Sequence, residues 1–459
     1  MTASSANREQ RMLHGPVLPV LAALALPNIL AMVAVAATSI AETTYVGLLG
    51  RDALAGMALI FPLVMLMQTF SAGAMGGGVS SAISRALGAG DEEGAQSLAR
   101  HAVVIALVAG ALFTFLFLVG GDALYRLLGA RGAVLDEAHR YATVAFSGVL
   151  LVWLANTMIS VIRGTGNMHV PSTSILAVAV LQIVLGALLG LGFGPIPRWG
   201  MAGVAWGQVL AYGAGCVWLA FYMCGPNSRI RLGPDGWQLS RERFWQILRV
   251  GLLACLSPLQ TVLTVLVMTG LVARLGVDAL AGYGIGARLE FLAIPIAFGV
   301  GVATLPMVGM AIGRGDVLRA RRVAWVGGAL SAGIVGVMGL MVALWPQVWS
   351  RLFTDKPEVL HYCAQYLHYA GPAYALFGLG LTLYFASQGA GKVLGPVLAG
   401  TLRLAVICVG GWLLTATQAP DWSYFALVGV AMAAYGVATA GAVWGTRWGE
   451  SRPVAAAAR

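Results

Sequence analysis

The feature that most constrains this chain is the recurrence of long apolar segments along its whole length. A helix needs about 20 mainly apolar residues to cross a bilayer. Only 10% of the residues are charged, so the chain lacks the polar surface that a soluble domain of this length requires. We therefore predict an all-α polytopic membrane protein with twelve transmembrane helices. The twelve segments lie near residues 17–41, 53–79, 96–119, 138–161, 171–193, 201–223, 246–272, 283–309, 322–345, 359–386, 394–415 and 423–445.

Basic residues are unevenly distributed over the loops between these segments. With the N-terminus in the cytoplasm, eighteen of the 28 Lys and Arg residues fall on the cytoplasmic side and seven in outer loops. Loops rich in Lys and Arg stay in the cytoplasm. The bias predicts a multi-pass protein of the inner membrane with both termini in the cytoplasm. It also explains the net charge of +10 without a nucleic-acid partner, and no feature requires a partner chain, so we expect a monomer.

The two halves of the chain repeat each other. VGLLGRDALAG (46–56) matches VARLGVDALAG (272–282), ALGAGDEEGA (86–95) matches AIGRGDVLRA (311–320), and RGTGNMHVP (163–171) matches QGAGKVLGP (388–396). The three matches occur in the same order and at a nearly constant offset. We expect an N-lobe of six helices at 1–231 and a C-lobe of six at 232–459, related by a pseudo-twofold axis around a central cleft. Many transporters alternate access by rocking such lobes.

Glu42 is an isolated acid at the end of the first predicted span. It follows an apolar run in ATSIAETTYVGLLG, and the nearest basic residue, Arg51, already lies in the next loop. Charges inside spans are expensive and are functional candidates for that reason. A carboxylate in a low dielectric can bind and release a proton, or exchange its proton for a cation. The alternative is that Glu42 ends the span at the outer interface.

Two further groups of polar residues lie in predicted spans. Arg288 and Glu290 begin the eighth span on different helix faces. They are either structural residues, as cross-helix ion pairs or interfacial anchors, or functional residues. His361, Gln365 and His368 share one face of the tenth span. That face suits a cavity lining, and ordinary interhelical hydrogen bonding is its alternative. No acidic partner accompanies the two His in this helix, which disfavours a metal site.

Buried amides in lipid need hydrogen-bond partners, and Met and aromatic side chains suit adaptable apolar ligands. On these grounds the candidates for a substrate cavity also include Met65, Gln68, Trp153, Gln208 and Gln260. Helix packing is the alternative for each of them. We expect no cofactor and no metal.

An ordered set of motifs over residues 15–445 resembles the multidrug and toxic compound extrusion family. The motifs are LALPNIL (24–30), ETTYVGLLG (42–50), SRALGAGDEEGA (84–95), IRGTGN (162–167), LGVDALAGYGIGARLE (275–290) and GVGVATLPMVGMAIGRGD (299–316). The resemblance implies export of organic cations and other amphipathic drugs, driven by inward flow of H⁺ or Na⁺.

The resemblance also implies roles for individual residues. Glu42 stands where the family usually has a coupling Asp, Gln182 where it has an Asn, and Asn156 where an Asn often neighbours the carboxylate. Gly186 replaces a frequent second Asp. One branch of the family relies on acids in spans 7 and 10 of the C-lobe. This chain instead has Gln260 in span 7, and His361, Gln365 and His368 in span 10. The chain therefore resembles more closely the DNA-damage-inducible branch, which is coupled through the N-lobe. This resemblance favours H⁺ over Na⁺ as the coupling ion.

We predict a secondary exporter of amphipathic cations with Glu42 as the ion-coupling residue and Gln182 and Asn156 as its polar neighbours. Four alternatives stay open. They are Na⁺ coupling, a lipid-linked oligosaccharide flippase of the same superfamily, an intramembrane enzyme that uses His361 and His368, and a non-transporting scaffold. A flippase would need a more cationic cleft than the few intramembrane Arg and Lys residues provide.

Overall fold

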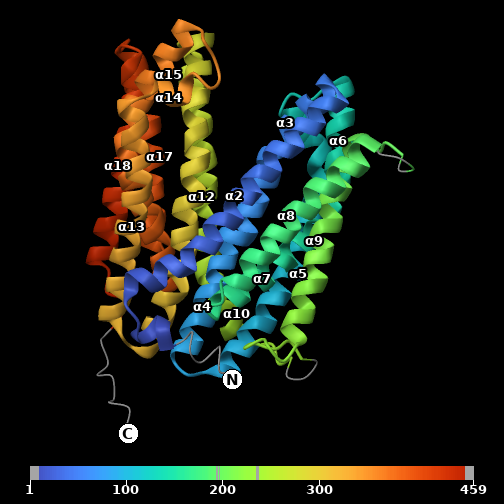
Figure 1. The fold of residues 1–459 in the computed structure, drawn as a ribbon, viewed down its shortest axis with the longest axis vertical. Coiled ribbons are helices and arrows are strands. Elements are labelled where there is room, and N and C mark those ends of the chain that lie inside the picture. Colours follow the sequence, from blue (N-terminus) through green and yellow to red (C-terminus); the bar gives the residue numbers. More distant parts are fainter. Residues whose placement is uncertain (1–9, 193–194, 196, 234–236, 450–459) are drawn as a thin grey trace. The chain divides into compact units, whose positions relative to one another are not determined.

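The structure is a computed structural model that describes residues 10–192, 195, 197–233 and 237–449. No strand occurs in this part of the chain. Each of the twelve predicted spans coincides with a helix or with consecutive helices (Figure 1). The elements are α2 (Val17–Leu49), α3 (Arg51–Thr69), η1 (Phe70–Met75), α4 (Gly76–Gly88), α5 (Glu92–Leu127), α6 (Gly132–Ser147), α7 (Val149–Gly164), α8 (His169–Ala187), η2 (Leu188–Gly192), α9 (Gly200–Cys224), α10 (Arg241–Ala254), α11 (Leu256–Ala273), α12 (Val277–Arg314), α13 (Val317–Leu344), α14 (Gln347–Ser350), α15 (Pro357–Ala370), η3 (Gly371–Ala373), α16 (Tyr374–Gly389), α17 (Leu394–Ala416) and α18 (Trp422–Gly445).

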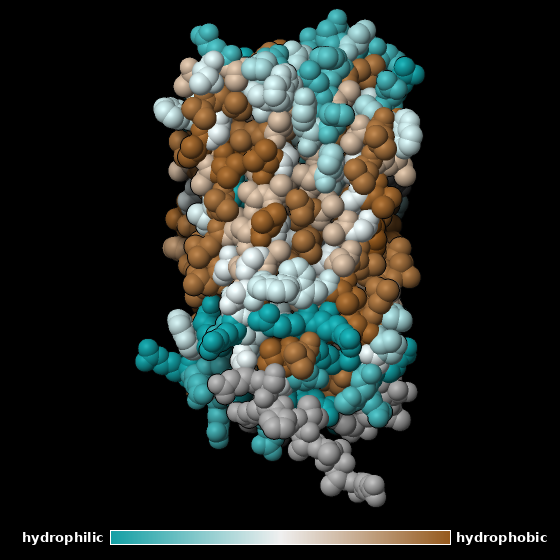
Figure 2. Space-filling view, turned by 90° about the vertical axis from the view of Figure 1, so that its left-hand side faces the viewer, coloured by the Kyte–Doolittle hydropathy of each residue, from teal (hydrophilic) through white to brown (hydrophobic). Residues whose placement is uncertain are grey.

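Most of these helices are long and apolar enough to cross a bilayer. Ten described helices pass that test, and α6 with α7, bent by 46°, would form an eleventh span. The remaining predicted span, 359–386, is divided between α15, η3 and α16. The face shown in Figure 2 carries a broad apolar band between two hydrophilic ends, as a surface in contact with lipid requires.

The chain forms two compact units. Among the described residues, unit 1 comprises Leu30–Gly251, and unit 2 comprises Gln10–Ile29 and the chain from Leu252 onward. The start of α2 therefore packs with unit 2, and most of α10 packs with unit 1. These units differ in extent from the sequence halves 1–231 and 232–459, whose division rests on the internal repeat and stays a prediction.

The repeat is visible in local backbone geometry. Asp91 caps α5 by accepting a hydrogen bond from the backbone N–H of Gly94 at 2.7 Å. Asp316, its counterpart in the second half, caps α13 in the same way through the N–H of Arg319 at 2.8 Å. The residue before each Asp is a glycine with positive φ, +79° at Gly90 and +86° at Gly315. Only glycine adopts this backbone conformation without strain, so the matching motifs are matching turns.

Unit 1 contains two short π-helical segments. η1 continues α3 into α4, and η2 continues α8. π-Helical turns are rare and occur often at functional sites. Both segments lie in or beside helices that supply the polar residues described below.

Candidate functional site

Glu42 lies inside α2 and is buried. Only 5% of the residue is exposed, and the helix continues to Leu49. The carboxylate is therefore enclosed by unit 1, and the helix continues for two more turns beyond it. An enclosed carboxylate is expensive unless it is hydrogen-bonded, protonated or paired with a cation.

Gln182 of α8 supplies the hydrogen bond. Its side-chain amide donates to Glu42 Oε1 at 2.7 Å, and Gln182 is itself only 7% exposed. A hydrogen bond to a charged group contributes about 1.5–3 kcal/mol. The structure thus brings together Glu42 and Gln182, two of the three residues that the sequence placed at one coupling site.

Three phenols lie near Glu42. Tyr45 of α2, Tyr141 of α6 and Tyr212 of α9 all lie within electrostatic range of the carboxylate. Tyr141 donates a hydrogen bond to Gln208 Oε1 at 3.2 Å, so this predicted cavity residue borders the same site. The side chains named around Glu42 are all uncharged. The site therefore has a single negative charge whenever Glu42 is ionised.

Gly186 shapes this site by lacking a side chain. A Cβ at this position would lie 2.6 Å from Tyr45 Oη. The Tyr45 hydroxyl thus occupies the space into which the second acid of the family pattern would project. This hydroxyl is buried and has no hydrogen-bond partner.

Asn156 belongs to a different cluster of polar residues. The side-chain amide of Asn156 donates to Ser71 Oγ in η1 at 2.8 Å, and its backbone carbonyl accepts from Ser160 Oγ at 2.7 Å. Trp153, one turn earlier on α7, is buried and stacks on Phe113 with ring centroids 5.5 Å apart. The structure thus places Asn156 against η1, where Ser71 is its side-chain partner. Its role as a neighbour of Glu42 stays a prediction.

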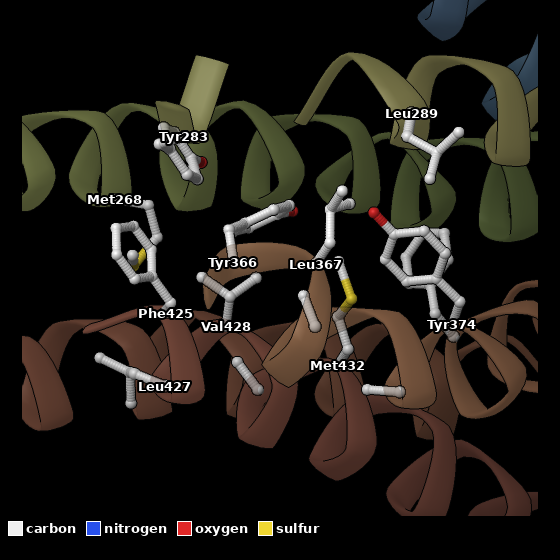
Figure 3. Close-up of a cluster of buried hydrophobic side chains, with 14 of the residues drawn as sticks. Met268, Tyr283, Leu289, Tyr366, Leu367, Tyr374, Phe425, Leu427, Val428 and Met432 are labelled. Atoms are coloured by element: carbon white, nitrogen blue, oxygen red, sulfur yellow. The ribbon is translucent and has the colours of Figure 1, made fainter. Parts of the chain in front are cut away.

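Unit 2 contains a second acid inside the fold, Glu290 of α12. Part of this residue is accessible, because it lines a small cavity. Its carboxylate accepts a hydrogen bond from the hydroxyl of Tyr366 on α15 and lies within electrostatic range of Arg403 on α17. Arg403 is 8% exposed, and its guanidinium lies 5.2 Å from the ring centroid of Phe377. Tyr366 belongs to the core cluster of Figure 3, where its hydroxyl end points toward that of Tyr374.

The other predicted cavity residues are dispersed. Gln260 donates to Thr401 at 2.8 Å, joining α11 to α17. Arg288 is exposed and lies over the ring of Phe353, at 5.4 Å. Gln68 is partly exposed and Met65 is 45% exposed.

The polar face of α15 points away from its packed side. Gln365 bonds His361 at 3.1 Å, and His361 and His368 are exposed. The buried face of this helix consists instead of Val359, Cys363, Tyr366, Leu367 and Ala370.

Sequence reasoning missed the phenols and Arg403. The rule that singled out Glu42 applies equally to Arg403, a charge well inside an apolar span. The repeat was a second unused signal, because Tyr366 is the counterpart of Tyr141 at the offset that relates 86 to 311.

An all-helical membrane protein with an acid inside each of two repeated units has the architecture of a secondary transporter. The comparison with protein families identifies it further. The MatE family model matches residues 27–188 and 254–412, one segment in each repeat. The chain belongs to the multidrug and toxic compound extrusion family, whose members are transporters and not enzymes.

Relatives match over most of their length. The FAD transporter of Shewanella oneidensis is 23% identical over 396 residues, which covers 86% of this chain and 87% of that protein. The probable multidrug resistance protein NorM of Thermotoga maritima is 26% identical over 365 residues, covering 78% and 77%. The structure of a transporter of the MOP superfamily from Pyrococcus furiosus superposes with a TM-score of 0.87 at 23% identity, covering 95% of this chain and 96% of that one. The predicted two-lobe, twelve-span fold is confirmed, whereas the assignment to the DNA-damage-inducible branch stays a prediction.

Proposed function

We propose that this transporter exports amphipathic organic cations in exchange for H⁺, and that the proton and the substrate compete for the site at Glu42. One observation supports this most directly: Glu42 is buried, and its hydrogen-bond partner is the neutral amide of Gln182. Such a carboxylate has two inexpensive states. It is either protonated or paired with a bound cation.

The same surroundings suit the substrate. Tyr45, Tyr141 and Tyr212 offer aromatic faces, which attract organic cations. Gln182 holds the carboxylate in place for either partner. The names of the relatives extend the range of substrates to test, because one is a multidrug resistance protein and another an FAD transporter.

In this scheme, protonation of Glu42 on the outer side removes the charge that binds the substrate. The substrate then leaves, and loss of the proton to the cytoplasm restores the site. H⁺ is favoured over Na⁺ because the hydrogen-bonded partner of the carboxylate, Gln182, presents an amide N–H and not an oxygen. A flippase for diphosphate-linked lipids is disfavoured, because the site is anionic when ionised. Export takes place at the inner membrane by a monomer with both termini in the cytoplasm.

The test is ethidium efflux measured in everted vesicles under an imposed pH gradient or an imposed Na⁺ gradient. Wild type is compared with Glu42→Gln and with Glu137→Gln, a control carboxylate whose partner is the exposed Arg140. We expect efflux to follow the pH gradient, to disappear in Glu42→Gln and to persist in Glu137→Gln.

Two results would contradict the proposal. Undiminished H⁺-driven efflux in Glu42→Gln would remove Glu42 from the coupling site. Efflux that follows only the Na⁺ gradient would replace the coupling ion. FAD is included as a competing substrate, and strong competition by this anionic dinucleotide would argue against cation selectivity.

A further inference from the structure

The two repeated units place different charges at equivalent positions. Met268 is the counterpart of Glu42 at the offset that relates 46 to 272, and Ile407 is the counterpart of Gln182 at the offset that relates 86 to 311. Both residues line one small cavity in unit 2, together with Glu290 and Arg403. That cavity is therefore the counterpart in unit 2 of the Glu42 site in unit 1. The sequence repeat and the geometry of unit 2 agree on this independently.

The phenol is common to both sites, but the charges are not. Tyr141 borders Glu42, and Tyr366 donates to Glu290. Position 403 corresponds to Val178 in unit 1, and position 290 corresponds to Val64 or Met65. The unit 1 site thus has one acid and no cation among these positions. The unit 2 site has an acid and a guanidinium supplied by two further helices.

Arg403 is well placed to compensate Glu290. Position 403 lies near the middle of α17, deep in the apolar span. Only 8% of the residue is exposed, and its Nε has no hydrogen-bond partner although the side chain lines the cavity. A guanidinium at such a depth is stabilised by a nearby negative charge. Within this cavity Glu290 is the acid that provides it.

The cavity would otherwise suit a small inorganic cation. It has the size of roughly one water molecule. Glu290, Thr264 and Tyr283 are among the residues that line it, and their side chains carry oxygen atoms, the ligands that hard cations prefer. Thr264 donates its hydroxyl proton to the Gln260 carbonyl, which leaves the oxygen lone pairs free to act as ligands.

We propose that Arg403 is a tethered counter-cation for Glu290, and that it closes the unit 2 site to Na⁺. The unit 2 carboxylate then stays charge-compensated throughout the transport cycle, while Glu42 alone exchanges its partner. This inference rests on the proposed H⁺ coupling for its functional meaning. The occupancy of the unit 2 site is measured separately from transport.

The experiment is equilibrium binding of radioactive Na⁺ to the purified full-length protein at alkaline pH. The variants are Arg403→Gln, Arg403→Lys, Glu290→Gln and the double variant Arg403→Gln/Glu290→Gln. We expect Arg403→Gln to gain saturable, stoichiometric Na⁺ binding. Wild type, the charge-retaining Arg403→Lys and the double variant should show none at this site. A merely structural role for Arg403 would change the thermal unfolding midpoint but would create no Na⁺ binding.

A folded Arg403→Gln protein that binds no more Na⁺ than the double variant would overturn the proposal. If Arg403→Gln does not fold, wild type and Glu290→Gln decide the matter, because the proposal requires equal Na⁺ binding by both. Loss of Na⁺ binding in Glu290→Gln relative to wild type would show that Arg403 does not close the site. Ethidium efflux under a pH gradient tests the Glu42 proposal separately, so either proposal can fail without the other.

Discussion

Adding one methyl group at Gly186 tests the packing that shapes the Glu42 site. In Gly186→Ala the new Cβ would lie 2.6 Å from Tyr45 Oη, so the phenol must move by roughly 1 Å to reach ordinary contact. Inserting a carbon into a packed site costs about 1–3 kcal/mol. We expect Gly186→Ala to lower the free energy of unfolding by this amount and to reduce efflux, because Tyr45 borders Glu42.

Removing the hydroxyl of Tyr45 should relieve the clash. The next atom of the ring, Cζ, is 3.3 Å from the built Cβ, a contact that small adjustments accommodate. Tyr45→Phe alone should cost little, because the hydroxyl that it removes has no hydrogen-bond partner. The double variant Tyr45→Phe/Gly186→Ala should therefore recover most of the lost stability, which makes the two substitutions strongly non-additive.

The assay is denaturant unfolding of the four proteins of this cycle in detergent, followed by circular dichroism. Gly47→Ala is the matched control, since a Cβ at this position of α2 meets nothing within 4 Å. The control should be neutral or slightly stabilising, as alanine favours helix more than glycine does. Two outcomes would refute the reasoning: a Gly186→Ala protein as stable as the control, or a double variant whose loss equals the sum of the single losses.

Three further predictions use hydrogen bonds of the two units. Gln182→Leu removes a charge-assisted bond worth about 1.5–3 kcal/mol, so H⁺-driven ethidium efflux should fall by on the order of tenfold with normal expression. Tyr366→Phe should lower the free energy of unfolding more than Tyr141→Phe does, because Tyr366 donates to a carboxylate and Tyr141 to a neutral amide. Equal losses of stability in denaturant unfolding would contradict the charge difference between the units. Asn156→Ala should cost about 1–3 kcal/mol of stability while efflux still follows the pH gradient, and a switch of the driving ion would instead place Asn156 at the coupling site.

Much of the fold could be predicted from the sequence because a membrane restricts the choice of structure. Lipid offers no hydrogen bonds, so each long apolar run has to be a helix, and hydropathy alone locates the spans. The repeat could be read because glycines with positive φ and capping Asp residues fix the same turns in both halves, as at Gly90–Asp91 and Gly315–Asp316. The Glu42–Gln182 contact followed from the family motifs.

The partners of polar residues could not be predicted in the same way. The spacing of residues along a membrane helix shows which of them share a face, but it does not show which face packs against a neighbouring helix. The polar face of α15 is an example. His361 and His368 share a face by spacing, yet that face is exposed, and Tyr366 on the opposite face reaches Glu290. Asn156 likewise bonds Ser71 of η1, and a π-helical segment leaves no recognised signal in the sequence.

The charge difference between the two units determines how many coupling ions one transport cycle requires. A duplicated fold begins with two equivalent sites, and two uncompensated enclosed carboxylates would each demand a proton or a cation. In this chain the unit 2 acid lies on α12, while Met268 occupies the position equivalent to Glu42, and Arg403 of α17 lines the same cavity as the acid. A compensated pair makes no such demand and does not compete for the driving ion. If Arg403 has this role, a single exchange at Glu42 sets the stoichiometry, and wild type should take up one H⁺ for each monovalent cation that it exports. Removing Arg403 should then raise the number of coupled cations without moving the site at Glu42.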